Sequence, residues 1–290
     1  MWKKAPLVSR GGKVEKEMKV TVLLENDVAK EGLTSAHGLS LYIESQEEKL
    51  LFDFGPDGTF LDNAKALGIH VEEVTKAFLS HGHQDHSGGL GAFLSVNDHA
   101  KVYIQEEAFL PHFSKQENGV LKDIGLPIAY KNHPQVEVVK EDLTVSPRLH
   151  LLSKISLAEM MPPGNETLYM EKDGELLPDD FHHEQNLLLE ERGQYVLFTG
   201  CGHRGILNVL ETLEEKKIEV AAVFGGFHVK KPSKINRDDT YVPRLAERLK
   251  ERDTLYYTCH CTGLKMYQRL QETLRDQVVY TSTGEEITLV

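Results

Sequence analysis

Residues 80–89, SHGHQDHSGG, place four side chains that can bind a metal ion on one short loop. His81, His83, Asp85 and His86 lie within six residues, and zinc accepts both imidazole nitrogen and carboxylate oxygen as ligands. In an extended segment His81 and His83 point the same way, whereas Asp85 and His86 follow after the chain turns and can face a second ion. The alternative is a surface loop that is rich in histidine by chance, and this spacing disfavours it.

Predicted strands and helices surround this loop and must position it. A buried strand is expected over 74–80 and a helix over 86–94, with Gly82, Gly88 and Gly89 permitting the turn between them. Further strands are expected over 18–24, 37–45, 49–55, 101–105, 186–191, 194–200, 218–226, 254–260, 277–282 and 285–290, and helices over 59–69, 206–217, 242–252 and 264–275. Residues 110–180 lack a clear period and are expected to form β-hairpins and loops over one face. Strands that alternate with helices, without a linker, predict an α/β fold.

The composition describes an acidic globular protein with an excess of histidine. The 290 residues include 33 Lys and Arg, 45 Asp and Glu, 14 His and 3 Cys, for a net charge of −12. This charge disfavours binding to nucleic acid, which relies on basic stripes, and no apolar run approaches the ~20 residues of a membrane span. The N-terminal segment lacks the apolar stretch of a secretory signal, so we expect a cytoplasmic protein without disulfides. We expect a loose tail over 1–17 and a single domain over 18–290.

The segment HGHQDH (81–86) has the H-x-H-x-D-H signature of the metallo-β-lactamase superfamily, which this chain resembles. Three further segments match that family in order along the chain, namely LFDFG (51–55), YVLFTGC (195–201) and TCHCTG (258–263). The resemblance spans about residues 18–290 and implies an α/β fold with four layers, an αβ/βα sandwich. It also implies that Asp53 supports the metal loop and that Cys201 and His260 are metal ligands.

The third ligand of the first metal site has two candidates. In the superfamily at large this histidine lies some twenty residues before the strand that ends in Asp or Cys, which is the place of His182. In a narrower branch of the family that stretch is acidic, as at Glu184, and a histidine after Gly-Cys recurs, which is His203 here. We expect His203 to be the ligand, with His182 as the competitor.

The three cysteines are expected to have different roles. Cys201 takes the position of a bridging ligand, where a thiolate would suit zinc, but it could equally be a small buried hydrophobic residue at a strand end. Cys259 and Cys261 flank His260 in a predicted strand. Because side chains alternate along a strand, both cysteines should lie opposite His260 and serve packing.

The resemblance implies a centre of two divalent metal ions, with zinc favoured and manganese or iron as alternatives. The expected ligands are His81, His83 and His203 for the first ion, and Asp85, His86 and His260, with Cys201 as a candidate, for the second. Two ions ~3.5–4 Å apart can share one water, lower its pKa to around 7 and polarise the scissile bond. Asp85 is the expected catalytic residue, which orients the resulting hydroxide and takes up its proton.

A narrower resemblance concerns the reaction. GCGHRGILN (200–208), GGFH (225–228) and HCTG (260–263) resemble the branch of dihydropteroate-synthase-like enzymes, which join a dihydropterin methyl diphosphate to a ribofuranosyl-aminobenzene phosphate. Many members of this branch are known only as metal-dependent hydrolases. We therefore expect a hydrolase or phosphate-processing enzyme that acts on a small anionic or phosphorylated substrate. The alternatives are a transferase that releases diphosphate, and a non-catalytic metal-binding or regulatory protein.

Residues that could hold such a substrate lie near the later motifs. His228 follows the strand over 218–226 and could orient a metal ligand or contact substrate. A basic run, KKPSKINR, begins at Lys230 and contains Lys231, Lys234 and Arg237. Charge runs are usually solvated loops, but in so acidic a chain this one could receive phosphate or carboxylate, and Arg204 could add to it.

Overall fold

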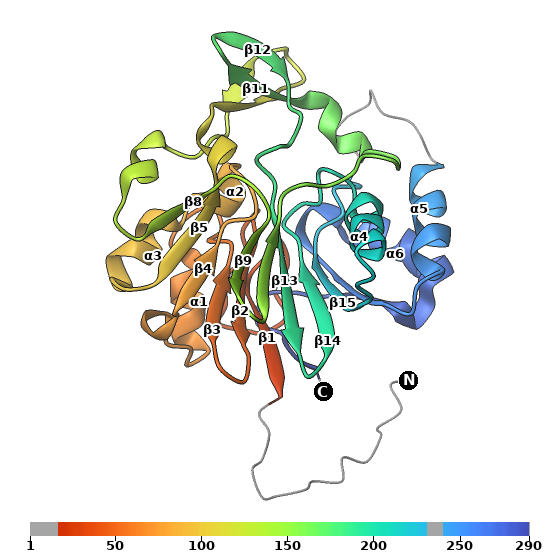
Figure 1. Cartoon of the computed structure of the whole chain (residues 1–290), viewed down its shortest axis with the longest axis horizontal. Coiled ribbons are helices and arrows are strands. Elements are labelled where there is room, and N and C mark those ends of the chain that lie inside the picture. The colour runs from red at the N-terminus through yellow and green to blue at the C-terminus, as the bar shows by residue number, and fades with distance from the viewer. Residues whose placement is uncertain (1–16, 231–239, 290) are drawn as a thin grey trace, which may run out of the picture.

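Two seven-stranded β-sheets form the centre of the computed structural model, which describes residues 17–230 and 240–289 (Figure 1). The first sheet has the order β18 (Glu286–Leu289), β1 (Met18–Leu24), β2 (Ser40–Glu44), β3 (Lys49–Phe52), β4 (Lys76–Phe78), β5 (Lys101–Gln105) and β8 (Val136–Val139). The second has the order β17 (Val278–Tyr280), β16 (Leu255–Thr258), β15 (Val220–Gly225), β14 (Gln194–Phe198), β13 (Asn186–Glu191), β10 (Leu149–Leu152) and β9 (Leu143–Ser146). A smaller sheet has the order β12 (Glu175–Pro178), β11 (Leu168–Lys172), β6 (His112–Lys115) and β7 (Leu121–Asp123).

Helices cover the outer face of each large sheet. The first sheet carries α1 (Thr59–Ala66), α2 (Gln84–Ser87) and α3 (Leu90–Val96), and the second carries α4 (Ile206–Glu215), α5 (Tyr241–Lys250) and α6 (Leu264–Leu274) (Figure 1). Short 3₁₀ helices occur at η1 (Val71–Glu73), η2 (Glu106–Phe109), η3 (Ile128–Asn132), η4 (Pro163–Thr167), η5 (His260–Thr262) and η6 (Arg275–Gln277). Among the described residues, no helix has the length and apolar character needed to cross a membrane.

Three apolar layers hold these elements together. The layer between the two sheets includes Phe52 and Phe198, whose ring centroids are 6.0 Å apart. A second layer lies under α1 and α3, and a third under α4, α5 and α6, where the buried side of α4 presents Leu207, Leu210 and Leu213. Each layer removes apolar surface from water, which is the main favourable contribution to folding. The result is the α/β four-layer sandwich that the resemblance implied.

Parallel strands bring their carboxyl ends to one rim of the two sheets. In the first sheet β3, β4, β5 and β8 are parallel, and in the second β14, β15, β16 and β17 are parallel. Ligands of open α/β sheets bind outside the carboxyl ends of the strands. Asp53 follows β3 directly, the histidine-rich loop follows β4, and Cys201, His228 and His260 follow β14, β15 and β16 closely.

The structure differs from the sequence predictions in several places. Residues 110–180 do not lie wholly over one face, because β8 extends the first sheet and β9 and β10 extend the second. The predicted strand over 254–260 ends at Thr258, and the chain then enters a 3₁₀ turn. The predicted helix over 86–94 is divided into α2 and α3. Residues 1–16 of the predicted tail lie outside the described residues.

Candidate metal centre

A buried carboxylate, Asp53, orients two histidines of the loop after β4. Its Oδ2 atom lies 2.6 Å from Nδ1 of His86 and accepts the Ser80 hydroxyl at 2.7 Å, and Ser80 Oγ lies 2.8 Å from Nδ1 of His81. The Ser80 hydroxyl has one proton, which it donates to Asp53, so it accepts the Nδ1 proton of His81. Both imidazoles therefore carry a proton on Nδ1, which leaves Nε2 as the atom that can bind a metal ion.

The histidines contributed by the second sheet are oriented in the same way. Nδ1 of His260 lies 2.9 Å from Oδ1 of Asn26, and Nδ1 of His203 lies 3.0 Å from Oδ1 of Asn165. The amide nitrogen of Asn165 donates to the carbonyl of His203 at 2.7 Å, which fixes the direction of that amide. In metal sites, hydrogen bonds of this kind set the tautomer and angle of each ligating imidazole.

The Nε2 atoms of these four histidines point toward one another. Nε2 of His81 is 3.3 Å from Nε2 of His203, and Nε2 of His86 is 3.1 Å from Nε2 of His260 and 3.2 Å from Sγ of Cys201. The donor atoms form overlapping groups in which all atoms lie within 4.8 Å of one another, including His81, His83 and His203; His81, His86 and Cys201; and Cys201, His260 and Cys261.

This donor set fits divalent metal ions. Two nitrogen lone pairs that face each other at 3.1–3.3 Å repel unless a proton or a cation is shared between them. Nitrogen, thiolate sulfur and carboxylate oxygen in one small buried space are the ligands of zinc sites.

Burial sets the protonation of the first histidine group. It lowers the pKa values of His81, His83 and His203, and for His81 and His203 the neighbouring histidines lower the value further. A neutral imidazole is the form that binds a metal ion. These three side chains are therefore held in the ligand form at neutral pH.

Two other groups of the centre carry charge. Burial alone would lower the pKa of His86, but the carboxylates of Asp53 and Asp85 raise it to about 9, so a metal ion that binds at Nε2 displaces a proton from that atom. Burial would raise the pKa of Asp85, but His86 and His260 hold it well below its usual range. The Asp85 Oδ2 atom lies 3.3 Å from Nε2 of His260 and 3.4 Å from Nε2 of His37, so Asp85 is an ionised carboxylate at the edge of the cluster.

The backbone around the cluster is unusual. Asp53, Phe181, His228 and His260 all have positive φ, between 47° and 62°, and residues in this region persist only where the surroundings hold them. Phe181 stacks on His203 with ring centroids 4.6 Å apart. The ring of His228 lies 4.2 Å from that of His203, which places His228 at the same rim.

A further buried network was not recognised from the sequence. Oδ2 of Asp179 lies 3.0 Å from Nδ1 of His112, 3.2 Å from Nε2 of His183 and 3.8 Å from Nε2 of His83. His183 Nδ1 accepts the backbone N–H of Gly82, so its proton is on Nε2 and is donated to Asp179. Nε2 of His83 faces this carboxylate, which leaves Nδ1 of His83 for the metal cluster. No motif marks His112 or Asp179, and His183 is the sequence neighbour of the candidate ligand His182.

The two candidates for the third ligand of the first site have different surroundings. His203 lies at the cluster, whereas the side chain of His182 is 55% exposed and pairs with Asp180 at 2.8 Å. The carboxylate of Glu184 accepts the backbone N–H groups of His203 and Arg204, and it thereby holds the backbone that carries His203.

The cysteine predictions have mixed outcomes. Cys259 packs in the apolar layer between the sheets, in agreement with its predicted role. The prediction for Cys261 is wrong, because the 3₁₀ turn at 260–262 replaces the alternation of a strand and brings its sulfur near His260 and Cys201. Cys201 is buried, and burial raises the pKa of its thiol well above the ordinary value, so it ionises only with a cation beside it.

The predicted substrate residues are dispersed. Lys230 is exposed, and its backbone N–H donates to the carbonyl of Cys261. Lys231, Lys234 and Arg237 lie outside the described residues. Arg204 is only 5% exposed, and its Nη2 donates to the carbonyl of Ile155.

The chain is similar to two curated proteins and to a solved structure over most of its length. It is 28% identical to protein MJ0448 of Methanocaldococcus jannaschii, covering 92% of this chain and 99% of that protein. It is 25% identical to the 7,8-dihydropterin-6-methyl-4-(β-D-ribofuranosyl)-aminobenzene-5′-phosphate synthase of the same organism, covering 87% and 90%. The crystal structure of Tm1679, a metal-dependent hydrolase of the β-lactamase superfamily, matches with a TM-score of 0.78 and 26% identity, covering 94% and 99%.

The family model of the metallo-β-lactamase superfamily matches residues 34–214, which is more than half of the chain. This span contains the loop of His81, His83, Asp85 and His86, and it ends after Cys201 and His203. The four-layer arrangement and the overlapping donor groups agree with the match. The chain belongs to the metallo-β-lactamase superfamily.

Proposed function

We propose that this protein is a metal-dependent hydrolase, or another phosphate-processing enzyme, that acts on a small anionic substrate at a centre of two divalent ions, with zinc as the favoured metal. The observation that carries the proposal is the convergence of four Nε2 atoms and one thiol at the rim, with a hydrogen-bond partner on Nδ1 of each of these four imidazoles. The proposed ligands are His81, His83 and His203 for one ion, and Asp85, His86, His260 and Cys201 for the other.

Divalent ions in such a centre supply Lewis acidity and make water a stronger acid. The protein's own groups do the rest. Asp53, Asn26 and Asn165 hold the Nδ1 protons, so that the Nε2 lone pairs remain directed into the centre. Asp85 is kept ionised by His86 and His260, so its Oδ2 is available to accept a proton from a water or a substrate hydroxyl. Phe181 covers one side of His203 and limits access of bulk water there.

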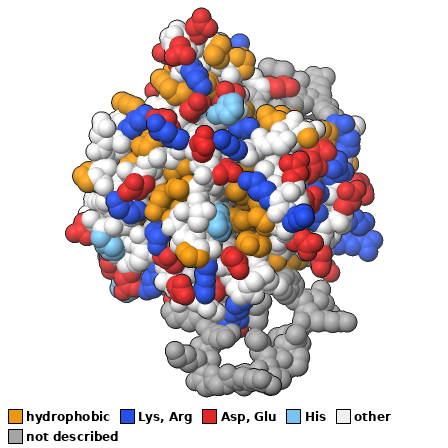
Figure 2. Space-filling model, in the orientation of Figure 1, with side chains coloured by type: hydrophobic (Ala, Val, Ile, Leu, Met, Phe, Trp, Pro, Cys, Tyr) orange, Lys and Arg blue, Asp and Glu red, His pale blue; other side chains and the backbone are white. Residues whose placement is uncertain are grey.

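The surface supports a small-molecule substrate rather than nucleic acid. On the face drawn in Figure 2, Lys and Arg side chains are interspersed with Asp and Glu and do not form a basic stripe. Non-specific binding of nucleic acid depends on such stripes. The net charge of −12 is in keeping with this proposal.

A transferase is the second candidate function. The similarity to the methanogen synthase, over nine-tenths of that protein, favours it. In this case the two ions would hold a diphosphate leaving group, and a nucleophile other than water would attack.

Activity measurements with protein of known metal content test these proposals. The protein is purified without added metal, its ions are determined by elemental analysis, and hydrolysis is followed with p-nitrophenyl phosphate, bis-p-nitrophenyl phosphate and a lactone. We expect about two ions per chain and turnover of at least one ester. A pterin methyl diphosphate incubated with an aminobenzene ribofuranosyl phosphate tests transfer, with diphosphate release as the readout.

The double variant His81→Ala/His83→Ala is the control, and it should lose metal and activity together. Lys19→Met removes an exposed charge that pairs with Glu286 and should change neither. Wild-type metal content in the double variant would exclude the assigned ligands. Full metal content with no turnover on any substrate would instead favour a metal-binding protein without catalytic function.

A further inference from the structure

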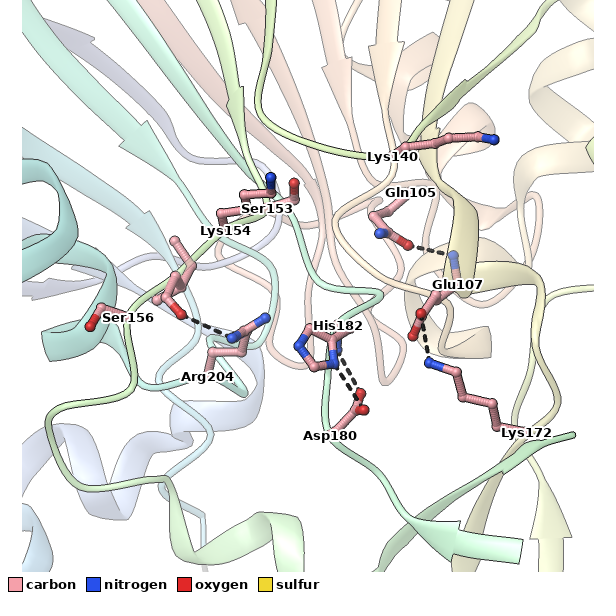
Figure 3. Close-up of a pocket in the computed structure, with 11 residues that line it drawn as sticks. Gln105, Glu107, Lys140, Ser153, Lys154, Ser156, Lys172, Asp180, His182 and Arg204 are labelled. Atoms are coloured by element: carbon pink, nitrogen blue, oxygen red, sulfur yellow. Dashed lines mark hydrogen bonds and ion pairs between the residues drawn. The ribbon is translucent and has the colours of Figure 1, made fainter. Parts of the chain in front are cut away.

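A cavity of about 520 Å³ opens beside the metal centre, and its wall is rich in cations. Four of its lining side chains are basic, namely Lys140, Lys154, Lys172 and Arg204, against two acidic ones, Glu107 and Asp180 (Figure 3). The lining therefore has an excess of positive charge in a chain whose net charge is −12. Such a local reversal of sign attracts an anionic ligand.

Residues that line the cavity also carry buried polar atoms whose hydrogen-bonding capacity is unused. Nε and Nη1 of Arg204 are buried without a partner, although Nη2 donates to the carbonyl of Ile155 at 2.9 Å. The Ser153 hydroxyl and Oε2 of Glu107 are also buried without a partner, and both residues line the same cavity. Unsatisfied buried polar groups are costly, so several in one wall indicate a ligand that satisfies them.

The lysines differ from Arg204 in their surroundings. Lys172 pairs with Oε1 of Glu107 at 2.8 Å across the cavity wall (Figure 3). Lys140 and Lys154 pair with Glu106 and Glu141, but these lysine side chains are 70% and 64% exposed. Exposed ion pairs contribute little, so these two lysines can turn toward a ligand at low cost.

Arg204 is connected directly to the metal centre. It follows His203 in the chain, and the backbone N–H groups of both residues donate to the same carboxylate, that of Glu184, at 2.7 and 2.8 Å. On the opposite wall, the carbonyl of Glu107 accepts a hydrogen bond from Nε2 of His112. His112 belongs to the Asp179 network beside His83. The cavity therefore adjoins the donor cluster at Arg204, the neighbour of His203, and adjoins the Asp179 network at Glu107.

We propose that this cavity binds the phosphate monoester group of the substrate, with Arg204 and Ser153 donating to its oxygens and Lys154 and Lys172 balancing its charge. The proposal rests on the function proposed above, because it places a part of the same substrate next to the metal ions. A phosphate monoester carries close to two negative charges at neutral pH and accepts hydrogen bonds on three oxygens, which matches the excess of cations better than a single carboxylate does. Oε2 of Glu107 is then left to accept a hydroxyl or amine of the substrate.

Isothermal titration of the purified, metal-containing protein with phenyl phosphate tests the proposal. Benzoate and inorganic phosphate are titrated in parallel. We expect phenyl phosphate to bind, benzoate to bind at least tenfold more weakly, and the affinity for phenyl phosphate to fall as salt is raised. Arg204→Met should lower the affinity for phenyl phosphate at least tenfold, because it removes a charge-assisted hydrogen-bond donor from a buried site. Ser153→Ala and Lys154→Met should each lower this affinity several-fold.

Controls separate this cavity from the metal ions as the source of binding. Lys19→Met, which removes a distant exposed cation, should leave the affinity within twofold of wild type. Metal content is determined for every variant and should be unchanged by Arg204→Met. Because Arg204 is buried, circular dichroism is used to check that the Arg204→Met variant folds. The smaller changes at Ser153 and Lys154 test the same cavity independently.

Unchanged affinity in all three cavity variants would overturn the proposal. So would a loss of binding in His81→Ala/His83→Ala together with full binding in the cavity variants, because the ions alone would then hold the phosphate. These outcomes do not depend on turnover. They are therefore distinct from failure of the proposed catalytic function, which metal content and hydrolysis measure.

Discussion

The carboxylate of Asp53 lies 2.6 Å from Nδ1 of His86, so one buried acid fixes which nitrogen of that imidazole carries the proton. The same oxygen also accepts a hydrogen bond from the Ser80 hydroxyl, and that hydroxyl accepts a hydrogen bond from Nδ1 of His81. A single side chain after β3 thus orients a histidine of each proposed metal site. The first prediction follows from this arrangement.

Asp53→Asn should weaken metal binding by about 10- to 100-fold, the usual effect of losing the partner of a ligating histidine. The amide keeps the volume but removes the charge, and its nitrogen cannot accept the proton on Nδ1. Competition with a chromophoric chelator measures the affinity. Asp62→Asn, an exposed residue of α1, is the matched control. Equal affinity in both variants would contradict the role given to Asp53.

The two candidate histidines for the first site should behave differently. His203→Ala removes an Nε2 atom that lies 3.3 Å from Nε2 of His81, so this variant should bind about one ion fewer per chain. His182→Ala changes a side chain that pairs with Asp180 at the surface, and it should retain the wild-type metal content. Elemental analysis of both variants gives the comparison. Loss of metal in His182→Ala alone would reverse the assignment.

Asp179→Asn should destabilise the protein because Asp179 is the shared acceptor of a buried histidine network. A hydrogen bond to a charged group contributes about 1.5–3 kcal/mol, whereas an exposed ion pair contributes about 0–1 kcal/mol. Asp180→Asn changes the adjacent exposed carboxylate and serves as the control. Urea unfolding should show a large difference in unfolding free energy between the two variants. A similar small effect in both would contradict the importance of the network.

Acid should destabilise the protein partly through His183. Burial and the neighbouring His112 lower the pKa of His183 to about 4, while an unfolded chain has the ordinary value of 6.5. Between these values the unfolded chain binds the proton and the folded chain does not, so stability falls as the pH drops. From pH 7 to pH 4.5 this linkage amounts to about 2 kcal/mol.

His183→Gln removes that linkage while keeping a donor for Asp179. The fall in unfolding free energy from pH 7 to pH 4.5 should therefore be about 2 kcal/mol smaller in this variant than in wild type. His99→Gln, at an exposed position, should show the wild-type pH dependence. Metal content measured at each pH separates this linkage from loss of ions in acid. Identical pH curves for wild type and His183→Gln would contradict the depressed pKa.

Much of the fold was predictable because its strands and helices follow simple hydrophobic periods. The metal loop was predictable for a different reason, since His81, His83, Asp85 and His86 are adjacent in sequence and share one chemistry. His112 and Asp179 could not be found in this way, because they come from an irregular region and meet only when the smaller sheet forms. The position of Cys261 also depends on tertiary structure, because a turn with positive φ at His260 replaces the expected strand.

The last prediction concerns Gly200, where the rims of the two sheets approach each other closely. An added Cβ at Gly200 would lie 2.1 Å from Oγ of Ser80 and 3.1 Å from Nδ1 of His81. Gly200→Ala must therefore displace the hydroxyl that links His81 to Asp53, and overpacking of this kind costs about 1–3 kcal/mol. Gly58→Ala is the control, because its Cβ would meet only the Cβ of Ala92 at an ordinary 3.4 Å. Urea unfolding and elemental analysis should show lower stability and lower metal content for Gly200→Ala alone, since the space beside Ser80 is what allows Asp53 to orient His81.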